Sequence, residues 1–92
     1  MATLNLKLHQ SLWQTDEPHE FTGSFEKLTI IEAIRQLLKE YPKILELCLN
    51  NGKKRPGILY ISDKVELASL GLLENQLDED LEIRIVPVLH GG

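Results

Sequence analysis

Residues 29–42 read TIIEAIRQLLKEYP, and they carry the clearest signal of regular structure in this sequence. Thr29 and Glu32 form a capping-box pattern, in which the threonine hydroxyl and the glutamate carboxylate each accept a hydrogen bond from the other residue's backbone N–H. Apolar side chains recur at helical spacing at Ile31, Ile34, Leu37, Leu38 and Tyr41. Because Pro42 disfavours the α conformation in the residue before it, the sequence predicts an amphipathic helix that ends near Glu40 and lies on a sheet.

Two strands are expected before this helix. Residues 3–8 alternate between polar and apolar side chains, which is the period of a strand with one buried face, so Leu4, Leu6 and Leu8 should point inward. Residues 14–20 have turn chemistry, and residues 21–27 can return as a second strand in which Gly23 marks a bulge or a weak point.

Several shorter segments follow the helix. Pro42 suits the first position of a second short helix, which contains Cys48 and ends at Asn51-Gly52. Residues 58–61 form a short continuous apolar run, which predicts a buried central strand. Residues 62–64 can turn the chain, residues 65–73 suit an irregular crossover, and residues 81–88 alternate again as a last strand.

The order strand, strand, helix, strand, crossover, strand describes an α+β domain with one main helix packed across a mixed sheet. At 92 residues, the chain is long enough for one hydrophobic core and too short for two. We therefore predict a single β-grasp domain over residues 1–88. Residues 89–92 have no evident structural role and are expected to form a flexible tail.

Composition excludes several classes of function. The net charge is −4, and charged residues of both signs make up 26% of the chain, which is unlike the basic footprint of a nucleic-acid binder. Neither a membrane-spanning apolar segment nor an N-terminal signal pattern is present. We expect a soluble cytoplasmic monomer whose partners are other proteins.

Few side chains suggest chemistry of their own. Cys48 is the only cysteine and lies on the apolar stripe of a predicted helix, where cysteine usually packs as a small hydrophobe. His9, His19 and His90 lack the spacing of metal ligands, and no serine stands in a nucleophile motif, so neither a metal site nor an enzyme active site is predicted. The basic run Lys53-Lys54-Arg55 suits a solvated loop, with contact to an acidic partner as the alternative.

Val86 and Val88 alternate with the inward-facing positions of the last predicted strand. If the outer face of the sheet is open, they form an apolar docking surface beside the tail. The alternative is that residues 70–73 fold over them.

This strand runs into Leu89-His90-Gly91-Gly92, and the terminal pair Gly91-Gly92 stands where glycine stabilises neither strand nor helix. A frayed end is one interpretation. The other is chemical, because a carboxylate that enters a narrow nucleotide-binding site to attack the α-phosphate of ATP needs a slim backbone on its last residues. The acyl-adenylate so formed can be attacked by sulfur or nitrogen, and the catalyst then lies in the partner.

Four segments together resemble the C-terminal half of the ubiquitin-related modifier family: Arg55-Pro56-Gly57-Ile58-Leu59, Leu70-Gly71, Gln76-Leu77 and Leu89-His90-Gly91-Gly92. The resemblance covers about the last 40 residues, whereas the first half agrees mainly in the order of its elements. The chain departs from the family at Ser62-Asp63-Lys64, where members carry an Asn-Asp turn, and this departure concerns a partner surface. The diglycine alone would equally fit the small subunit of molybdopterin synthase or the thiamine sulfur carrier.

The resemblance implies a β-grasp fold and a sulfur carrier that also acts as a protein modifier. It implies that an E1-like enzyme uses ATP to activate Gly92, with Leu89, His90 and Gly91 as the approach to that enzyme, and that no cofactor is bound by this chain. The resulting C-terminal thiocarboxylate would supply a tRNA thiolation enzyme, and the same activated end would join lysines of target proteins. The alternatives are a sulfur-donating subunit in molybdopterin or thiamine synthesis and a passive ubiquitin-like docking domain.

Overall fold

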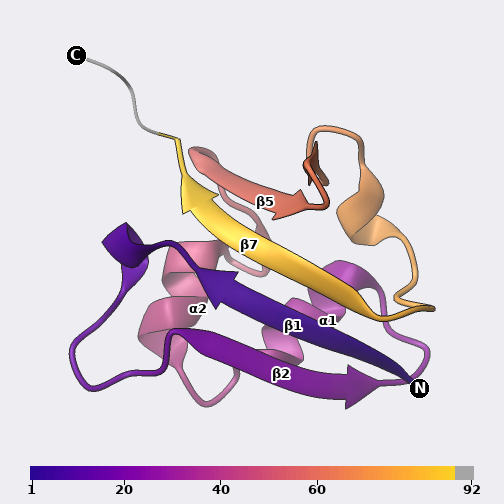
Figure 1. Cartoon of the computed structure of the whole chain (residues 1–92), viewed down its shortest axis with the longest axis horizontal. Coiled ribbons are helices and arrows are strands. Elements are labelled where there is room, and N and C mark those ends of the chain that lie inside the picture. The colour runs from indigo at the N-terminus through magenta and orange to yellow at the C-terminus, as the bar shows by residue number, and fades with distance from the viewer. Residues whose placement is uncertain (89–92) are drawn as a thin grey trace.

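Five strands form one mixed sheet in the order β2-β1-β7-β5-β6. In that order they are Glu20–Phe25, Ala2–Leu8, Leu81–Pro87, Ile58–Ser62 and Val65–Glu66. Strands β1 and β7 run parallel in the centre, and every other neighbouring pair is antiparallel. In the computed structural model, which describes residues 1–88, helices α1 (Ile30–Leu37) and α2 (Pro42–Cys48) lie on one face of this sheet (Figure 1). The predicted α+β class and β-grasp fold are confirmed.

The core lies between the sheet and the two helices, because the central strands place alternate side chains on that side. Leu4 and Leu6 of β1 and Ile83 and Ile85 of β7 are completely buried, as the alternating pattern predicted. The intervening side chains of both strands point to the opposite face, which no helix within residues 1–88 covers (Figure 1). The sheet therefore has a helix-covered face and an open face.

Helix α1 begins as predicted. The Thr29 hydroxyl accepts from the Glu32 N–H at 3.2 Å, and the Glu32 carboxylate accepts from the Thr29 N–H at 2.9 Å. These bonds lower the pKa of Glu32. The expected end near Glu40 was wrong, because the helix stops at Leu37 and the last turn tightens, with the Lys39 N–H reaching the carbonyl three residues earlier.

The buried stripe of α1 also differs from the expected one. The buried side chains are Ile30, Ala33, Ile34 and Leu38. Ile31, Leu37 and Tyr41 are only partly buried around this stripe. The apolar spacing indicated the helix correctly, but two adjacent isoleucines left its rotation ambiguous, since either of them fits a stripe through Ile34.

Helix α2 has Pro42 at its first turn and contains the buried Cys48, as the sequence predicted. The other buried side chain of this helix is Ile44, which the sequence did not indicate. The helix ends at Cys48 rather than at Asn51-Gly52. Those two residues instead turn a small hairpin between β3 (Leu49–Asn50) and β4 (Lys53–Lys54), with φ of +52° and +78°. Both angles suit an Asn-Gly hairpin turn.

The prediction that residues 58–61 form a central strand was wrong in position. They do form β5, but this strand lies between β7 and the short edge strand β6, so only Tyr60 is fully buried. Tyr60 points to the helices, whereas Leu59 and Ile61 are half-buried on the open face. The side chains of this continuous apolar run therefore alternate between the core and the open face, and they are not all enclosed in the core.

The remaining connections match the expected irregular chain. Residues 63 and 64 turn β5 into β6, and the crossover continues through a short 3₁₀ helix, η2 (Leu72–Glu74), that packs against α1. Another 3₁₀ helix, η1 (Gln10–Leu12), follows β1. Gly23 is paired regularly with Leu4 and forms no bulge. A Cβ there would lie 2.9 Å from Leu37 Cδ1, so glycine allows the helix to approach the sheet.

Candidate functional site

The described part of the chain ends at Val88, just past β7, and this point is held by a loop from the middle of the chain. Just past the strand, the Val88 backbone N–H donates to the Gly57 carbonyl at 2.8 Å. Gly57 has φ of +84°, which glycine adopts readily. The predicted tail, Leu89, His90, Gly91 and Gly92, lies outside the described residues. We call Val88 and the loop at Gly57 the tail root, because the predicted tail follows Val88 in the sequence.

The loop that holds Val88 is itself fixed by a buried tyrosine. Tyr60 is fully buried, and its hydroxyl donates to the carbonyl of Cys48 at 2.6 Å. The same oxygen accepts from the Arg55 N–H at 2.8 Å. This chain of bonds links the end of α2 to the segment 55–59, which carried part of the family resemblance. That segment thus supports the root of the tail.

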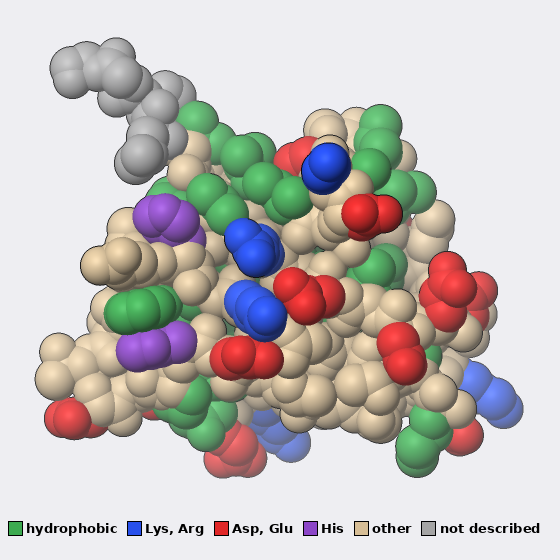
Figure 2. Space-filling model, viewed as in Figure 1, with side chains coloured by type: hydrophobic (Ala, Val, Ile, Leu, Met, Phe, Trp, Pro, Cys, Tyr) green, Lys and Arg blue, Asp and Glu red, His purple; other side chains and the backbone are tan. Residues whose placement is uncertain are grey.

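The open face next to this root is apolar. Leu59 of β5 lies opposite Val86 of β7, and Ile61 occupies the next outward position on β5. Figure 2 shows hydrophobic side chains gathered along the upper part of this face. Val88 is 38% exposed and, together with Leu59 and Pro56, lines a shallow hollow of about 340 Å³. We call Leu59, Ile61, Val86 and Val88 the apolar patch.

The segment of residues 70–73 lies elsewhere. Leu73 is buried where η2 packs against α1, and Leu70 is 63% exposed. Because η2 packs against α1, it leaves the Val88 side chain partly exposed. Ala68 and Ser69 line the same 340 Å³ hollow as Val88. Val86 and Val88 thus remain candidates for docking.

Charged side chains adjoin the apolar patch on the open face. Lys7 and Arg84 occupy opposed positions on β1 and β7, and the Lys7 ammonium lies 3.6 Å from the Glu82 carboxylate. Figure 2 shows two basic side chains with acidic ones beside them across the middle of the sheet. This part of the face was not identified from the sequence, although the outward positions of both strands contained the signal.

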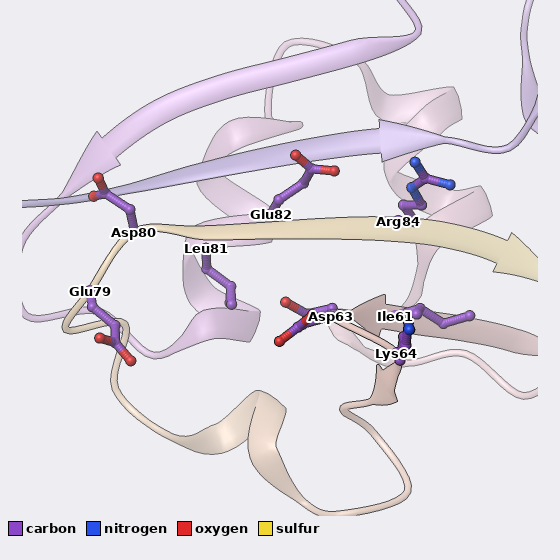
Figure 3. Close-up of a pocket in the computed structure, with 9 residues that line it drawn as sticks. Ile61, Asp63, Lys64, Glu79, Asp80, Leu81, Glu82 and Arg84 are labelled. Carbon is purple, nitrogen blue, oxygen red and sulfur yellow. The ribbon is translucent and has the colours of Figure 1, made fainter.

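A hollow of about 810 Å³ lies between β7 and the turn from β5 to β6. Its charged lining residues are Asp63, Lys64, Glu79, Asp80, Glu82 and Arg84. In Figure 3, Glu82 and Arg84 lean toward β1, whereas Asp63 and Lys64 come from the turn on the other side of β7. Asp80 accepts from the Thr3 backbone N–H at 2.9 Å, so it has a structural role. Within residues 1–88, no group of three or more His, Cys, Asp or Glu side chains is placed to hold a metal ion.

Cys48 is completely buried, and burial raises the pKa of its thiol to about 12. A neutral, enclosed thiol is a poor nucleophile, so the predicted packing role of this cysteine is confirmed. His9 caps η1 by accepting from the Ser11 N–H, and His19 stacks on Trp13 with ring centroids 3.8 Å apart. Both described histidines have local structural contacts.

The basic run is partly regular rather than a plain loop. Lys53 and Lys54 form β4 with exposed side chains, and the Arg55 guanidinium donates to the Glu46 carbonyl. Among residues 1–88, no helix is long and apolar enough to cross a membrane.

Comparison with known proteins supports the family resemblance. Ubiquitin-related modifier 1 of Mus musculus is 38% identical to this chain over 58 residues. The matched segment covers 63% of this chain and 54% of the mouse protein, so it spans about half the length of that relative. No protein-family profile matches the chain.

Solved structures share the fold over the whole chain. The crystal structure of SAMP1 from Haloferax volcanii has a TM-score of 0.76 at 16% identity, covering 99% of this chain and 100% of that one. The solution structure of the small archaeal modifier protein SAMP1 from Methanosarcina acetivorans has a TM-score of 0.75 at 25% identity, covering 100% and 98%. The first likeness shows the fold alone. With the mouse relative, these matches confirm the predicted resemblance to ubiquitin-related modifiers, and the chain is similar to small ubiquitin-like protein modifiers.

Proposed function

We propose that this chain is a ubiquitin-like sulfur carrier and protein modifier whose reacting group is the carboxylate of Gly92. The observation that carries the proposal is the hydrogen bond that holds the end of β7, because Gly91 and Gly92 follow this strand end within a few residues of sequence. The bond from Val88 to Gly57 fixes where the tail begins, and the segment 55–59 that fixes it belongs to the family resemblance. The similarity to ubiquitin-related modifier 1 supports the same assignment.

The chemistry takes place in a partner enzyme. An E1-like activating enzyme binds ATP, and a Gly92 carboxylate oxygen attacks the α-phosphorus, forming the acyl-adenylate and releasing pyrophosphate. A sulfur nucleophile held by the partner then attacks the Gly92 carbonyl carbon. AMP leaves, and when the nucleophile is a cysteine persulfide the product is an acyl disulfide. A second thiol of the partner then attacks the cysteine sulfur of this acyl disulfide, which forms a disulfide within the partner and releases the thiocarboxylate. If a lysine ε-amine attacks the activated carbonyl instead, the product is an isopeptide bond. The chain itself therefore acts as a substrate and carrier and not as an enzyme.

The residues of the tail have complementary roles in this proposal. Gly91 and Gly92 keep the backbone narrow enough for the activating site, since neither carries a side chain. Leu89 and His90 form the approach to the enzyme. The sulfur of the thiocarboxylate passes to a tRNA thiolation enzyme, and target proteins supply the acceptor lysines. We place this function in the cytoplasm, with the chain as a monomer and without direct contact to nucleic acid or membrane.

The apolar patch is the docking surface in this proposal. An activating enzyme must hold the domain while the tail extends into its active site, and an apolar surface beside the tail root suits that task. Val86 lies opposite Leu59 and next to the root, so a partner that covers both positions also controls the direction of the tail. The helix-covered face remains free of this partner.

Deletion of Gly92 tests the proposal. The shortened chain should fold with unchanged circular dichroism and unfolding midpoint, since the deleted residue lies beyond the strand that ends at Pro87. It should lose pyrophosphate exchange with ATP and the activating enzyme of its host. Retained exchange by the shortened chain contradicts the proposal. A permanent complex of the full chain with a larger pterin-forming or thiamine-forming subunit would instead favour the alternative of a sulfur-donating enzyme subunit.

A further inference from the structure

Two like charges oppose each other at the centre of the open face. Lys7 and Arg84 are register partners on the parallel strands β1 and β7, and both lie on the side away from the helices. Like charges at directly opposed positions in a sheet are destabilising. A carboxylate compensates the charge of one of the two residues, because Glu82 Oε1 lies 3.6 Å from Lys7 Nζ.

Arg84 has no equivalent compensation. No ion pair or hydrogen bond to its guanidinium is formed within residues 1–88. On the neighbouring strand β5, the residue paired with Arg84 is the apolar Ile61. The other nearby carboxylate, Glu20, lies beyond Lys7 on β2 and accepts from the Asn5 amide at 2.8 Å. Figure 3 shows Arg84 leaning toward β1, away from Asp63. The guanidinium therefore offers an unused set of donors.

A small hollow accompanies this arginine. It measures about 210 Å³ and is lined by Lys7, Leu8, His9, Arg84 and Val86. Its two charged side chains are both cationic, the Lys7 ammonium and the Arg84 guanidinium, and the His9 ring lines the hollow beside them. His9 Nδ1 accepts from the Ser11 N–H at 3.1 Å, so a neutral ring carries its proton on Nε2 and can donate from there. The volume exceeds the ~30 Å³ share of one water several times over.

We infer that this hollow receives a carboxylate side chain of the activating enzyme, adjacent to an apolar side chain that covers Val86. This inference rests on the proposed function for the identity of the partner. A carboxylate matches the planar donor fork of arginine, which binds it through two parallel hydrogen bonds. Arg84 and Val86 are alternate residues of one strand, about 7 Å apart. The partner must therefore present an acidic and an apolar group at about that separation.

The charges of the chain favour a carboxylate over a nucleic-acid backbone. Binding of nucleic acid requires several cations that neutralise successive phosphates. Here Arg84 is the one cation of the hollow that has neither an acidic partner nor a fixed local bond within the described part of the chain, and Glu82 and Glu20 lie close by. The whole chain carries a net charge of −4. A polyanion would be repelled, whereas one side-chain carboxylate is accommodated.

The test uses the full chain and two capped tripeptides, Leu-Asp-Leu and Leu-Asn-Leu, in nitrogen-15 NMR titrations. We expect the acidic peptide to shift the amides of Lys7, His9 and Arg84 and to bind at least fivefold more tightly than its amide counterpart. Arg84→Gln should remove this difference, and Lys43→Gln should keep it. Lys43 is exposed on α2, away from the sheet, so the control loses the same charge. Equal binding of the two peptides, no binding, or a difference that survives Arg84→Gln overturns the inference.

A second measurement uses the activating enzyme. Arg84→Glu should raise the KM for the chain at least tenfold in pyrophosphate exchange, with kcat changed less than twofold. Lys43→Glu, which changes the net charge equally, should alter KM less than twofold. An equal effect of both variants would indicate long-range steering and contradict a local contact. If the unaltered chain is not activated at all, the proposed function fails, whereas the peptide titration still decides the inference about the hollow.

Discussion

The backbone N–H of Val88 lies 2.8 Å from the carbonyl oxygen of Gly57, and this hydrogen bond joins the root of the tail to the loop before β5. The loop is in turn bonded through Arg55 to the buried hydroxyl of Tyr60. Residues separated by about 30 positions in the sequence thus fix the point from which Gly92 must reach its partner. The family resemblance in segment 55–59 has a structural explanation in this contact.

Replacing Gly57 by alanine should impair activation more than stability alone explains. Gly57 has φ of +84° and open space around a Cβ, so the substitution strains the backbone by about 1 kcal/mol without a clash. Gly71 has φ of +71° and equally open space, but it lies before η2, away from the tail root. Both alanine variants should lose similar stability in urea unfolding. Only Gly57→Ala should slow pyrophosphate exchange, and equal slowing by Gly71→Ala would contradict this role of the loop.

Replacing Val88 by serine should weaken docking of the activating enzyme. Val88 and Val65 are each 38% exposed, so serine at either site removes a similar amount of apolar surface from the free chain. Val65 lies on the edge strand β6, away from the tail root. We expect Val88→Ser to raise the KM for the chain about tenfold and Val65→Ser to change it less than twofold. Identical KM values for the two variants would exclude Val88 from the docking surface.

Replacing Tyr60 by phenylalanine should destabilise the domain by about 1–3 kcal/mol, because the buried Cys48 carbonyl and the Arg55 N–H lose their partner. Tyr41 serves as the control. Its ring packs edge-on against Phe21, and its hydroxyl forms no hydrogen bond within residues 1–88. Tyr41→Phe should change the free energy of unfolding by less than about 0.5 kcal/mol. Denaturant unfolding distinguishes the two, and a similar small change for both would contradict the role of the Tyr60 hydroxyl.

Replacing Glu66 by glutamine should reduce the acid sensitivity of the fold. Burial alone would raise the pKa of Glu66, but hydrogen bonds from the Tyr60, Ser69 and Ala68 N–H groups outweigh it and lower the pKa below its ordinary value of 4.5. A lowered folded-state pKa stabilises the fold above the unfolded-state value, and this contribution is lost as pH falls through the folded-state pKa.

Unfolding measured from pH 6 to pH 3 checks this prediction. Glu66→Gln should lose less stability on acidification than the unaltered chain. Glu79→Gln is the control, since Glu79 is an exposed glutamate for which no hydrogen bond is formed within residues 1–88. An unchanged pH profile for Glu66→Gln would mean that the carboxylate is not held by these donors.

The sequence was sufficient to predict the class of fold because its strongest patterns are local. Alternation gave the buried faces of β1 and β7, and the pair Thr29 and Glu32 marked the start of α1, where the structure has both hydrogen bonds. Pro42 likewise marked the first turn of α2. Each of these signals depends on neighbours within a few residues, so no knowledge of tertiary contacts is needed.

The predictions that failed concern features that depend on contacts between distant segments. The apolar run 58–61 does not specify whether its strand is central or next to the edge, because only the pairing with β7 and β6 decides this. The same limitation hid Leu59 and Ile61 as members of the open face. The opposition of Lys7 and Arg84 was also hidden, since it follows from the parallel register of the first and last strands.

The central claim is that Gly92 carries the activated carboxylate, and intact-protein mass spectrometry of the chain from its native host tests it most directly. Purification must preserve thiocarboxylates, and fragmentation must locate the modified residue. The account predicts a chain that ends at Gly92 and a fraction of it in which sulfur has replaced one oxygen at that residue. If the activating enzyme and a sulfur source are present and Gly92 carries only its ordinary carboxylate, the sulfur-carrier function is contradicted.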